Sequence, residues 1–210
     1  MPATVHTLVN GPLEQNCYAL QAQGRADCIL IDPGSGADEL QARLQGLGLS
    51  PALILATHGH YDHVGAVHGL AQWSGADFGM AKADEPWLDS LEDTFAFYGM
   101  GPTRRPTVQR WIAPGETLEA AGLRLQVLGT PGHTPGGLCY YHAESGSLFS
   151  GDTLFAGSVG RSDMDGGDAE ALIAGIKREL LPLPEGTRVY PGHGESSTLG
   201  REKRENRFLR

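Results

Sequence analysis

The amino-acid sequence predicts an α/β fold: a four-layer αββα sandwich of two mixed β-sheets that pack together and are flanked by helices. Two observations support this prediction. Each half of the chain contains strand-like apolar runs followed by helical segments, with no internal period of the solenoid type. Histidine and aspartate residues recur at the ends of strand-like runs in both halves. The length of 210 residues suits one generous domain, and we expect residues 1–210 to form it.

The first half is predicted to open with strands. Apolar alternation and turn residues mark three in succession, which indicates an antiparallel start to a sheet. Leu40, Leu44 and Leu47 then fall at helical spacing, and Gly48 marks the end of that helix. The expected elements are strands over 3–10, 16–22 and 27–31, a helix over 37–47, a strand over 53–56, a helix over 64–73, a strand over 77–81 and a helix over 84–98.

The second half returns to strands after a loop rich in glycine and proline, from Gly99 to Pro106. This loop is either a solvated connector or a mobile rim of a site. Further along, Asp168 is a suitable helix N-cap, and Pro182 ends the helix that it starts. The expected elements are strands over 107–112, 116–119, 122–128, 137–142 and 147–150, a helix over 168–180, a strand over 189–190 and a helical tail over 198–210.

Composition and charge restrict the partners of this chain. A net charge of −9 argues against nucleic acid, because phosphate binding requires a basic face. We expect no secretory signal, because the N-terminus lacks a basic region followed by an apolar run, and no membrane span, because no apolar run approaches about 20 residues. The scattered cysteines Cys17, Cys28 and Cys139 are expected to be small buried hydrophobic residues in a cytoplasmic protein.

One stretch concentrates metal-binding side chains: Thr57-His58-Gly59-His60-Tyr61-Asp62-His63. It follows an apolar run and precedes a helix, so it lies where a strand ends. Imidazole and carboxylate groups are ligands for Zn²⁺ and similar divalent ions. His58 and His60, two positions apart, can point the same way from an extended segment. Asp62 and His63 follow on the turn and can face a second point nearby, so this stretch can serve two adjacent metals.

Three further ligand candidates follow apolar strand-like runs. They are His133 in Pro-Gly-His-Thr-Pro-Gly, Asp152 in Gly-Asp-Thr and His193 in Pro-Gly-His-Gly. Either histidine alone would be an ordinary turn residue, but together with the first cluster the set predicts one metal site with ligands from four segments. Asp32 precedes a Pro-Gly turn at a strand end, and we expect it to cap that turn or support a ligand rather than bind metal.

This pattern resembles the metallo-β-lactamase-fold hydrolase superfamily over essentially the full chain. The H-x-H-x-D-H arrangement of residues 58–63, with the later His, Asp and His, is highly specific for that fold. Gly151-Asp152-Thr153-Leu154-Phe155 and Gly160-Arg161-Ser162-Asp163 are similar to the glyoxalase II (hydroxyacylglutathione hydrolase) branch. The segment from Pro191 to the chain end is similar to the compact, YcbL-type bacterial members of that branch.

The resemblance implies a site with two divalent metal ions. In that arrangement the first metal is bound by His58, His60 and His133, the second by Asp62, His63 and His193, and Asp152 bridges both. Zinc fits these ligands best, and iron or manganese can occupy the same set. A hydroxide between the metals, with Asp62 and Asp152 as catalytic carboxylates, would attack the carbonyl carbon of a small acyl thioester. The expected substrate is S-lactoylglutathione, which would yield glutathione and D-lactate.

The sequence defines substrate contacts less sharply. Arg161 follows Asp152 closely and is a candidate for the pocket mouth, whereas Tyr61 lies inside the metal loop and can reach either the substrate or the surroundings of a metal ligand. The tail is locally basic and is either an anion grip for substrate carboxylates or a solvated, salt-bridged helix. Its candidate contacts are Arg201, Lys203 and Arg204. Larger glyoxalase II enzymes grip glutathione with a separate C-terminal helical domain, which we expect to be absent here.

Three other functions remain open. Persulfide dioxygenases share the fold and use one iron, held by residues that match His58, His133 and Asp152, but they typically have Ala-His-Asp where this chain has Gly-His-Gly around His193. A lactonase or another ester hydrolase would use the same two metals. A metal-stabilised binding domain without activity is disfavoured, because all seven ligand positions are intact. The sequence does not predict an oligomeric state.

Overall fold

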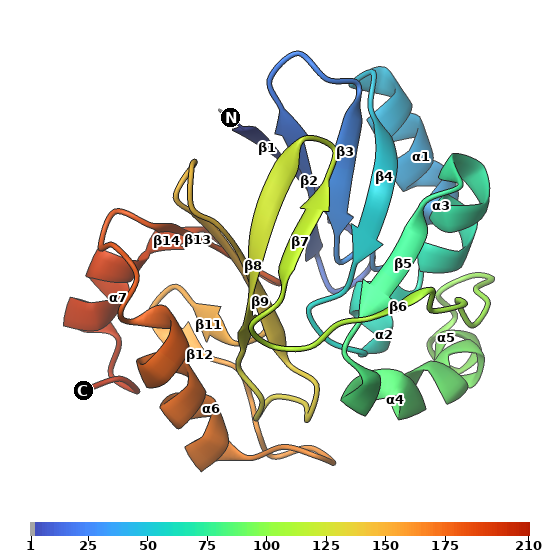
Figure 1. Ribbon diagram of the computed structural model, residues 1–210. Coiled ribbons are helices and arrows are strands. Elements are labelled where there is room, and N and C mark those ends of the chain that lie inside the picture. The colour runs from blue at the N-terminus through green and yellow to red at the C-terminus, as the bar shows by residue number, and fades with distance from the viewer. Residues whose placement is uncertain (1–2) are drawn as a thin grey trace.

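The computed structural model describes residues 3–210 and has the predicted four-layer arrangement (Figure 1). Two six-stranded sheets pack against each other. Helices from the first half of the chain cover the outer face of the first sheet, and helices from the second half cover the outer face of the second. The fold class expected from the sequence is confirmed.

The first sheet follows the order of the chain. Its strands are β1 (Ala3–Asn10), β2 (Gln15–Ala22), β3 (Asp27–Ile31), β4 (Ser50–Leu55), β5 (Asp77–Met80) and β6 (Arg110–Trp111). The pairs β1–β2 and β2–β3 are antiparallel, as expected, and the pairs from β3 to β6 are parallel. The change comes where helical segments connect the strands, because a parallel neighbour needs a crossover connection.

The second sheet is also mixed. In sheet order its strands are β14 (Ser197–Thr198), β13 (Arg188–Pro191), β10 (Ser147–Gly151), β9 (Leu138–His142), β8 (Leu123–Gly129) and β7 (Thr117–Ala120). Only β10 and β13 are parallel among these pairs, and the segment between them contains two of the helical elements that cover this sheet, residues 169–180. A small ribbon of β11 (Leu154–Phe155) and β12 (Ser158–Val159) lies in the same segment and was not predicted.

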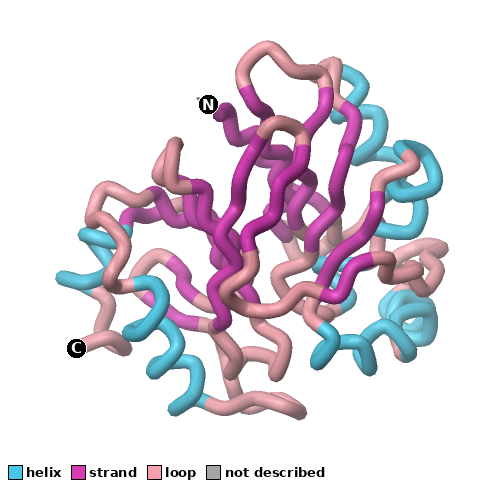
Figure 2. The backbone as a smooth tube through the Cα atoms, in the orientation of Figure 1, coloured by secondary structure: helices cyan, strands magenta, loops and turns pink. Residues whose placement is uncertain are grey.

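The helices are short and lie outside the strands (Figure 2). They are α1 (Ala37–Gly46), α2 (Tyr61–Val64), α3 (Val67–Ser74), α4 (Glu85–Asp89), α5 (Leu91–Tyr98), α6 (Ala169–Gly175) and α7 (Leu199–Glu205), with a 3₁₀ turn η1 (Lys82–Asp84) and a π-helical turn η2 (Ile176–Leu180). Within residues 3–210, no helix has the length and apolar character needed to cross a bilayer.

Strand alternation divides the core into three layers. In β2, Leu20 points into the cluster between the sheets, whereas Cys17 and Ala19 point into the cluster under the first-half helices. In β9, Tyr140 belongs to the cluster between the sheets and Cys139 to the cluster under α6. All three cysteines are fully buried and reduced, as predicted. The central strands of both sheets are therefore covered on both faces, whereas strands such as β1 and β8 keep one face partly exposed.

Several expected elements have different bounds in the structure. The helix expected over 64–73 begins only at Val67, because Val64 belongs to the end of α2. Gly65, between the two helices, packs against the ring of Phe95, where an added Cβ would lie 2.0 Å from Cζ. The helix expected over 84–98 is divided at Ser90, and the strand over 107–112 pairs only at β6. The tail helix ends at Glu205, because the buried side chain of Asn206 turns back to bond the carbonyl of Ser158.

Candidate metal centre

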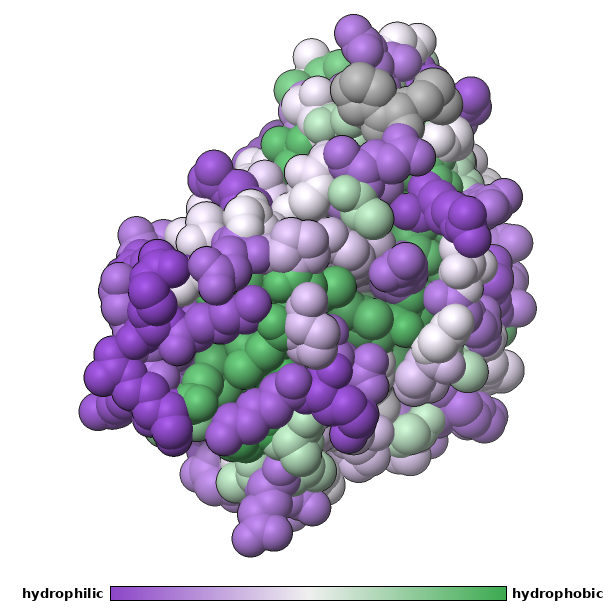
Figure 3. All heavy atoms as spheres, turned by 60° about the vertical axis from the view of Figure 1, so that its left-hand side comes forward, coloured by the Kyte–Doolittle hydropathy of each residue, from purple (hydrophilic) through white to green (hydrophobic). Residues whose placement is uncertain are grey.

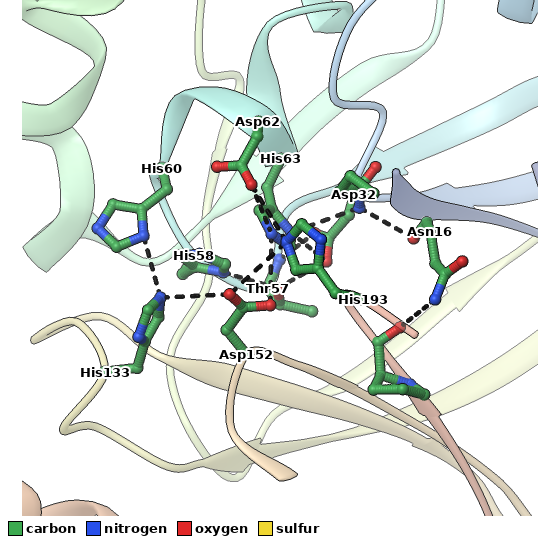
Figure 4. A network of polar contacts seen from close by, with 12 residues as sticks. Asn16, Asp32, Thr57, His58, His60, Asp62, His63, His133, Asp152 and His193 are labelled. Atoms are coloured by element: carbon green, nitrogen blue, oxygen red, sulfur yellow. Dashed lines mark hydrogen bonds and ion pairs between the residues drawn. The ribbon is translucent and has the colours of Figure 1, made fainter. Parts of the chain in front are cut away.

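The seven predicted ligands lie together at the carboxyl ends of strands from both sheets (Figure 4). The first sheet supplies His58 and His60 after β4 and Asp62 and His63 in α2, and the second supplies His133 after β8, Asp152 after β10 and His193 after β13. Each strand is fixed by ladder bonds up to its last residue, so the ligand that follows starts from a rigid point.

Three imidazoles form one candidate metal position. His58, His60 and His133 each offer a ring nitrogen within 4.8 Å of the others. Nδ1 of His60 lies 3.0 Å from Nε2 of His133. The His60 and His133 rings meet edge to face, with centroids 4.7 Å apart, so both nitrogens point to one place. These are the residues that the resemblance assigned to the first metal.

A second position lies beside the first. Asp62, His63 and His193 also offer ligand atoms within 4.8 Å of one another. Oδ2 of Asp62 lies 3.2 Å from Nε2 of His193 and 3.7 Å from Nε2 of His63. These are the residues that the resemblance assigned to the second metal, and they lie in segments that follow strands of different sheets.

Asp152 lies between the two groups. Its Oδ1 is 3.4 Å from Nε2 of His63, in the second group, and its Oδ2 is 3.6 Å from Nε2 of His133, in the first. Oδ2 is also 3.8 Å from Nε2 of His193. A carboxylate can use its two oxygens on two ions, so this placement suits a bridging ligand.

Outer partners orient the imidazoles. Asp32 Oδ2 accepts a hydrogen bond from Nδ1 of His63 at 3.0 Å, which supports the expected role of Asp32 as an aid to a ligand. The carbonyl of Arg161 accepts from Nδ1 of His133 at 2.7 Å, and the carbonyl of Leu13 accepts from Nδ1 of His193 at 3.0 Å. These acceptors keep the proton on Nδ1, so Nε2 presents its lone pair to the centre.

The electrostatics differ between the two positions. Burial lowers the pKa of His58 well below its usual value, and burial together with His133 lowers the pKa of His60 to about 3. Both rings are therefore neutral at physiological pH, which is the form that binds a metal. At the second position burial would lower the pKa of His63, but Asp62 and Asp152 raise it to about 10. Those carboxylates make this position favourable for a positive charge.

The residues fit a pair of metal ions. Within residues 3–210, four buried side-chain polar atoms have no hydrogen-bond partner: His58 Nε2, His63 Nε2, Asp152 Oδ1 and Thr187 Oγ1. Three of the four are ligand atoms of this centre, and each points toward it. A buried polar atom without a partner is costly, so a cluster of such atoms indicates a place where an ion or ligand binds. The nitrogen and oxygen donors match the preferences of zinc, iron and manganese.

A model of the metallo-beta-lactamase superfamily matches residues 10–193, from β1 to the last histidine of the centre. The chain belongs to the metallo-β-lactamase superfamily. The hydroxyacylglutathione hydrolase GloC of Haemophilus influenzae is 38% identical over 93% of each chain. The crystal structure described as the BLEG-1 B3 metallo-beta-lactamase is 34% identical, with a TM-score of 0.91 over 98% of this chain and 99% of that one. A structure of TTHA1623 in a di-iron-bound form is 41% identical, with a TM-score of 0.86 over 97% and 100%.

Within this superfamily fold, one buried carboxylate that the sequence did not reveal ties two ligand loops together. Asp84, at the end of η1, is fully buried. Its Oδ2 accepts from Gly59 N at 2.9 Å and from Thr134 Oγ1 at 2.7 Å, and its Oδ1 accepts from Gly136 N at 2.6 Å. It therefore joins the loop of His58 and His60 to the loop of His133. In the sequence Asp84 looks like an ordinary residue at a helix start, and no local signal separates the two roles.

The metal centre opens into a cleft of about 700 Å³. Tyr61 and Arg161, two predicted substrate contacts, line it. The guanidinium of Arg161 does not lie free, because it donates to both oxygens of Asp163 at 2.8 and 3.0 Å. The strongest connection of Arg161 to the centre is thus its carbonyl, which holds His133.

The basic tail lies elsewhere. Arg201, Lys203 and Arg204 are not among the residues that line the cleft. Arg201 pairs with Glu205, Lys203 donates to the carbonyl of Leu183, and Arg204 lies near Glu185. In Figure 1, α7 is at the left edge, away from α4 and α5 beside the cleft. Figure 3 turns that side forward and shows hydrophilic ridges on either side of an apolar furrow. The structure favours the salt-bridged helix over the anion grip for these three residues.

Proposed function

We propose that this protein is a binuclear metal-dependent hydrolase that cleaves thioesters such as S-lactoylglutathione, releasing glutathione and D-lactate. The placement of Asp152 between two complete ligand groups carries this proposal, because it makes a centre for two metals rather than one. The likeness to a hydroxyacylglutathione hydrolase supports a thioester as the substrate class. The partner is accordingly a small molecule.

When bound, two divalent cations would lower the pKa of a water and polarise the scissile carbonyl. Asp62 lines the cleft beside His193, and although burial alone would raise its pKa, His63 and His193 hold it at about 2. Asp62 is therefore a carboxylate at neutral pH and can accept a hydrogen bond from the attacking water. Asp152, which faces both groups, fixes the distance between them.

The bond changes need no separate acid. The water oxygen joins the carbonyl carbon, the carbon–sulfur bond breaks, and its electron pair leaves with sulfur as a thiolate. A thiol has a pKa near about 8.5, so the thiolate is a good leaving group at neutral pH. The proton given up by the water then goes to the thiolate or to solvent. This agrees with a cleft whose lining histidines are all candidate metal ligands, which leaves none of them free to act as a separate acid.

The resident metal is proposed to be zinc, because four-coordinate nitrogen and oxygen sites suit it. The same donors accept iron or manganese, and one structural neighbour is described in a di-iron form. Metal analysis of the protein, purified under reducing conditions and without added chelator, identifies which of these ions is bound and how many are bound per chain.

The test is hydrolysis of S-lactoylglutathione by protein of known metal content, followed by loss of thioester absorbance and release of thiol. Turnover with two metals per chain is the expected result, and protein stripped by a chelator is the control. Absence of turnover with two metals bound would overturn the thioester proposal. One iron per chain, with oxygen uptake on glutathione persulfide, would instead establish the dioxygenase.

A second candidate is hydrolysis of lactones or β-lactams. It is favoured by the likeness to a structure described as a B3 metallo-beta-lactamase. These reactions also begin with water adding to a carbonyl carbon, so the same centre could carry them. Parallel assays with an aliphatic lactone and a chromogenic β-lactam decide this, because kcat/KM above that for the thioester would reverse the order of the two candidates.

A further inference from the structure

The cleft beside the metal centre has an unusual concentration of exposed apolar side chains. Seven large hydrophobic residues of the described chain are exposed: Val9, Leu13, Leu47, Phe97, Tyr98, Trp111 and Phe208. Three of these, Leu13, Phe97 and Tyr98, line this one cleft, and Phe97 is 81% exposed. Contiguous exposed apolar surface in a cleft is typical of a binding site, because leaving it in water is unfavourable.

Aromatic rings connect the metal loop to the outer wall of the cleft. The ring of Tyr61 stacks on that of Tyr98, with centroids 5.6 Å apart and planes 20° apart. Phe97 meets Tyr98 edge to face at 5.0 Å. On the inner side, Trp87 meets the ligand His60 edge to face at 4.9 Å. The exposed rings of α5 are thus held in place by contacts that start at residues of the metal loop.

The opposite side of the cleft is also apolar. Leu13 lies in the β1–β2 turn, where its carbonyl holds the ligand His193, so its side chain is fixed beside the centre. Met164 lines the cleft from the loop before α6, and its flexible side chain adapts to different shapes. An apolar group that entered between Leu13, Met164 and the α5 rings would lose contact with water on several sides.

The charges of the cleft disfavour a carboxylate at its outer part. Besides Asp62 and Asp152 of the metal centre, the charged lining residues are Asp93 and Arg161. Arg161 is neutralised by its paired bonds to Asp163. Asp93 is exposed and forms no ion pair among residues 3–210. A substrate carboxylate at this point would meet one uncompensated negative charge and no free cation.

We propose that the outer cleft is a subsite for an apolar, preferably aromatic, group of the substrate, with Phe97 and Tyr98 as its specificity-determining residues. This inference rests on the proposed thioester hydrolysis and narrows its substrate class. Thioesters that carry a phenyl group on the acyl or the thiol part are better substrates than those whose distal parts are small or carboxylate-bearing. Glutathione carries two carboxylates, so as the thiol part of the substrate it is tolerated rather than optimal.

The kinetic test compares matched thioesters. S-mandeloylglutathione differs from S-lactoylglutathione only in a phenyl in place of a methyl group, and S-lactoyl benzyl mercaptan tests the thiol side. At least one phenyl-bearing substrate should have a kcat/KM several-fold higher than S-lactoylglutathione, and which one does so tells whether acyl or thiol part occupies the subsite. In the Phe97→Ala variant that preference should shrink about two- to tenfold, the range expected for loss of one aromatic contact.

The controls separate this subsite from general effects. Phe208→Ala removes an exposed phenyl group that lies outside the cleft, and it should leave the preference for phenyl-bearing substrates unchanged. Asp93→Asn should raise kcat/KM for S-lactoylglutathione without changing that for the benzyl mercaptan ester. Because Phe97 is exposed, its truncation should not disturb folding. Phenyl substrates that are no better than S-lactoylglutathione, or a preference unchanged in Phe97→Ala, would overturn the subsite.

A binding measurement makes the test independent of turnover. The S-benzyl thioether of N-acetylcysteine cannot be hydrolysed at sulfur and should bind more tightly than the S-methyl thioether, as followed by calorimetry. Phe97→Ala should remove most of that difference. If no thioester is hydrolysed but the benzyl thioether still binds through Phe97, the proposed function fails and the subsite stands. If Phe97→Ala changes only the sedimentation behaviour of the protein, the rings form a contact between copies and the subsite is wrong.

Discussion

Replacing Asp84 with asparagine tests whether one buried carboxylate holds the first metal position together. The variant keeps the shape of the side chain, but an amide has one oxygen where the carboxylate has two. If that oxygen takes the place of Oδ2, the bonds from Gly59 N and Thr134 Oγ1 remain. The amide NH₂ then faces Gly136 N, which now lies 2.6 Å from an acceptor and would be left with none.

The size of the effect follows from those contacts. One hydrogen bond to a charged acceptor is lost and one buried N–H is left without a partner, which together cost about 2–4 kcal/mol. Burial raises the pKa of Asp84, so the charge itself carries a desolvation cost that the amide relieves. The loss should therefore be nearer to about 2 kcal/mol. Because domains of this kind are stable by about 5–15 kcal/mol, the variant should still fold.

Two measurements check this prediction. Urea unfolding should show the lower free energy of unfolding, and Asp77→Asn, the same change at an exposed strand residue, is the control. Titration with Co²⁺ should show weaker binding at the position of His58, His60 and His133, because Asp84 joins the loops that carry them, and little change at the other. A loss of less than about 0.5 kcal/mol in the free energy of unfolding, or equal weakening of Co²⁺ binding at both positions, would refute the role of Asp84 in holding the first metal position together.

Three further predictions follow from the centre and the core. Asp152→Ala should remove most activity and weaken both metals together, and metal analysis showing two retained ions with full activity would contradict its bridging position. Gly192→Ala should disrupt metal binding, because a Cβ there would lie 2.2 Å from Oδ1 of Asp152, whereas Gly186→Ala, where nothing lies within 4 Å, should behave like the wild type. Burial raises the pKa of Cys28 to about 12 and of Cys139 to about 11, so neither thiol should react with a thiol reagent at neutral pH until the chain unfolds. As pH rises above about 8.5, the unfolded chain loses these protons before the folded one does, so the free energy of unfolding should fall, which urea titrations at a series of pH values measure.

Much of the metal centre was accessible from the sequence because its signals are local. A strand reads as an unbroken apolar run where both of its faces are buried, as in β10, and as an apolar alternation where one face is exposed, as in β8, so a histidine or aspartate in the turn at its end stands out. That is why His133, Asp152 and His193 could be identified at the ends of β8, β10 and β13. The same contrast gave the first three strands and their antiparallel order.

The contacts around the metal centre could not be predicted from the sequence, because they join segments that lie far apart in the chain. Asp84 bonds Gly59 and Gly136, which lie 25 and 52 positions away. From the sequence, the basic residues of α7 fit an anion grip and a salt-bridged helix equally well, and only the packing of α7 against the second sheet places them away from the cleft. The helix expected over 84–98 gave no sign that its last turn would expose Phe97 beside the cleft.

The sequence by itself therefore determined the fold class and the identity of the candidate ligands, since these depend on periodicity within single elements and on side-chain chemistry at strand ends, and its motifs carried the resemblance that implied the family and the grouping of the ligands. Only the tertiary structure decided how near the ligand atoms of the two groups lie to one another and to Asp152, which outer residues hold them, and which side chains line the cleft. The physical reason is that distances between segments depend on how the sheets and helices pack, and many distant residues determine that packing together.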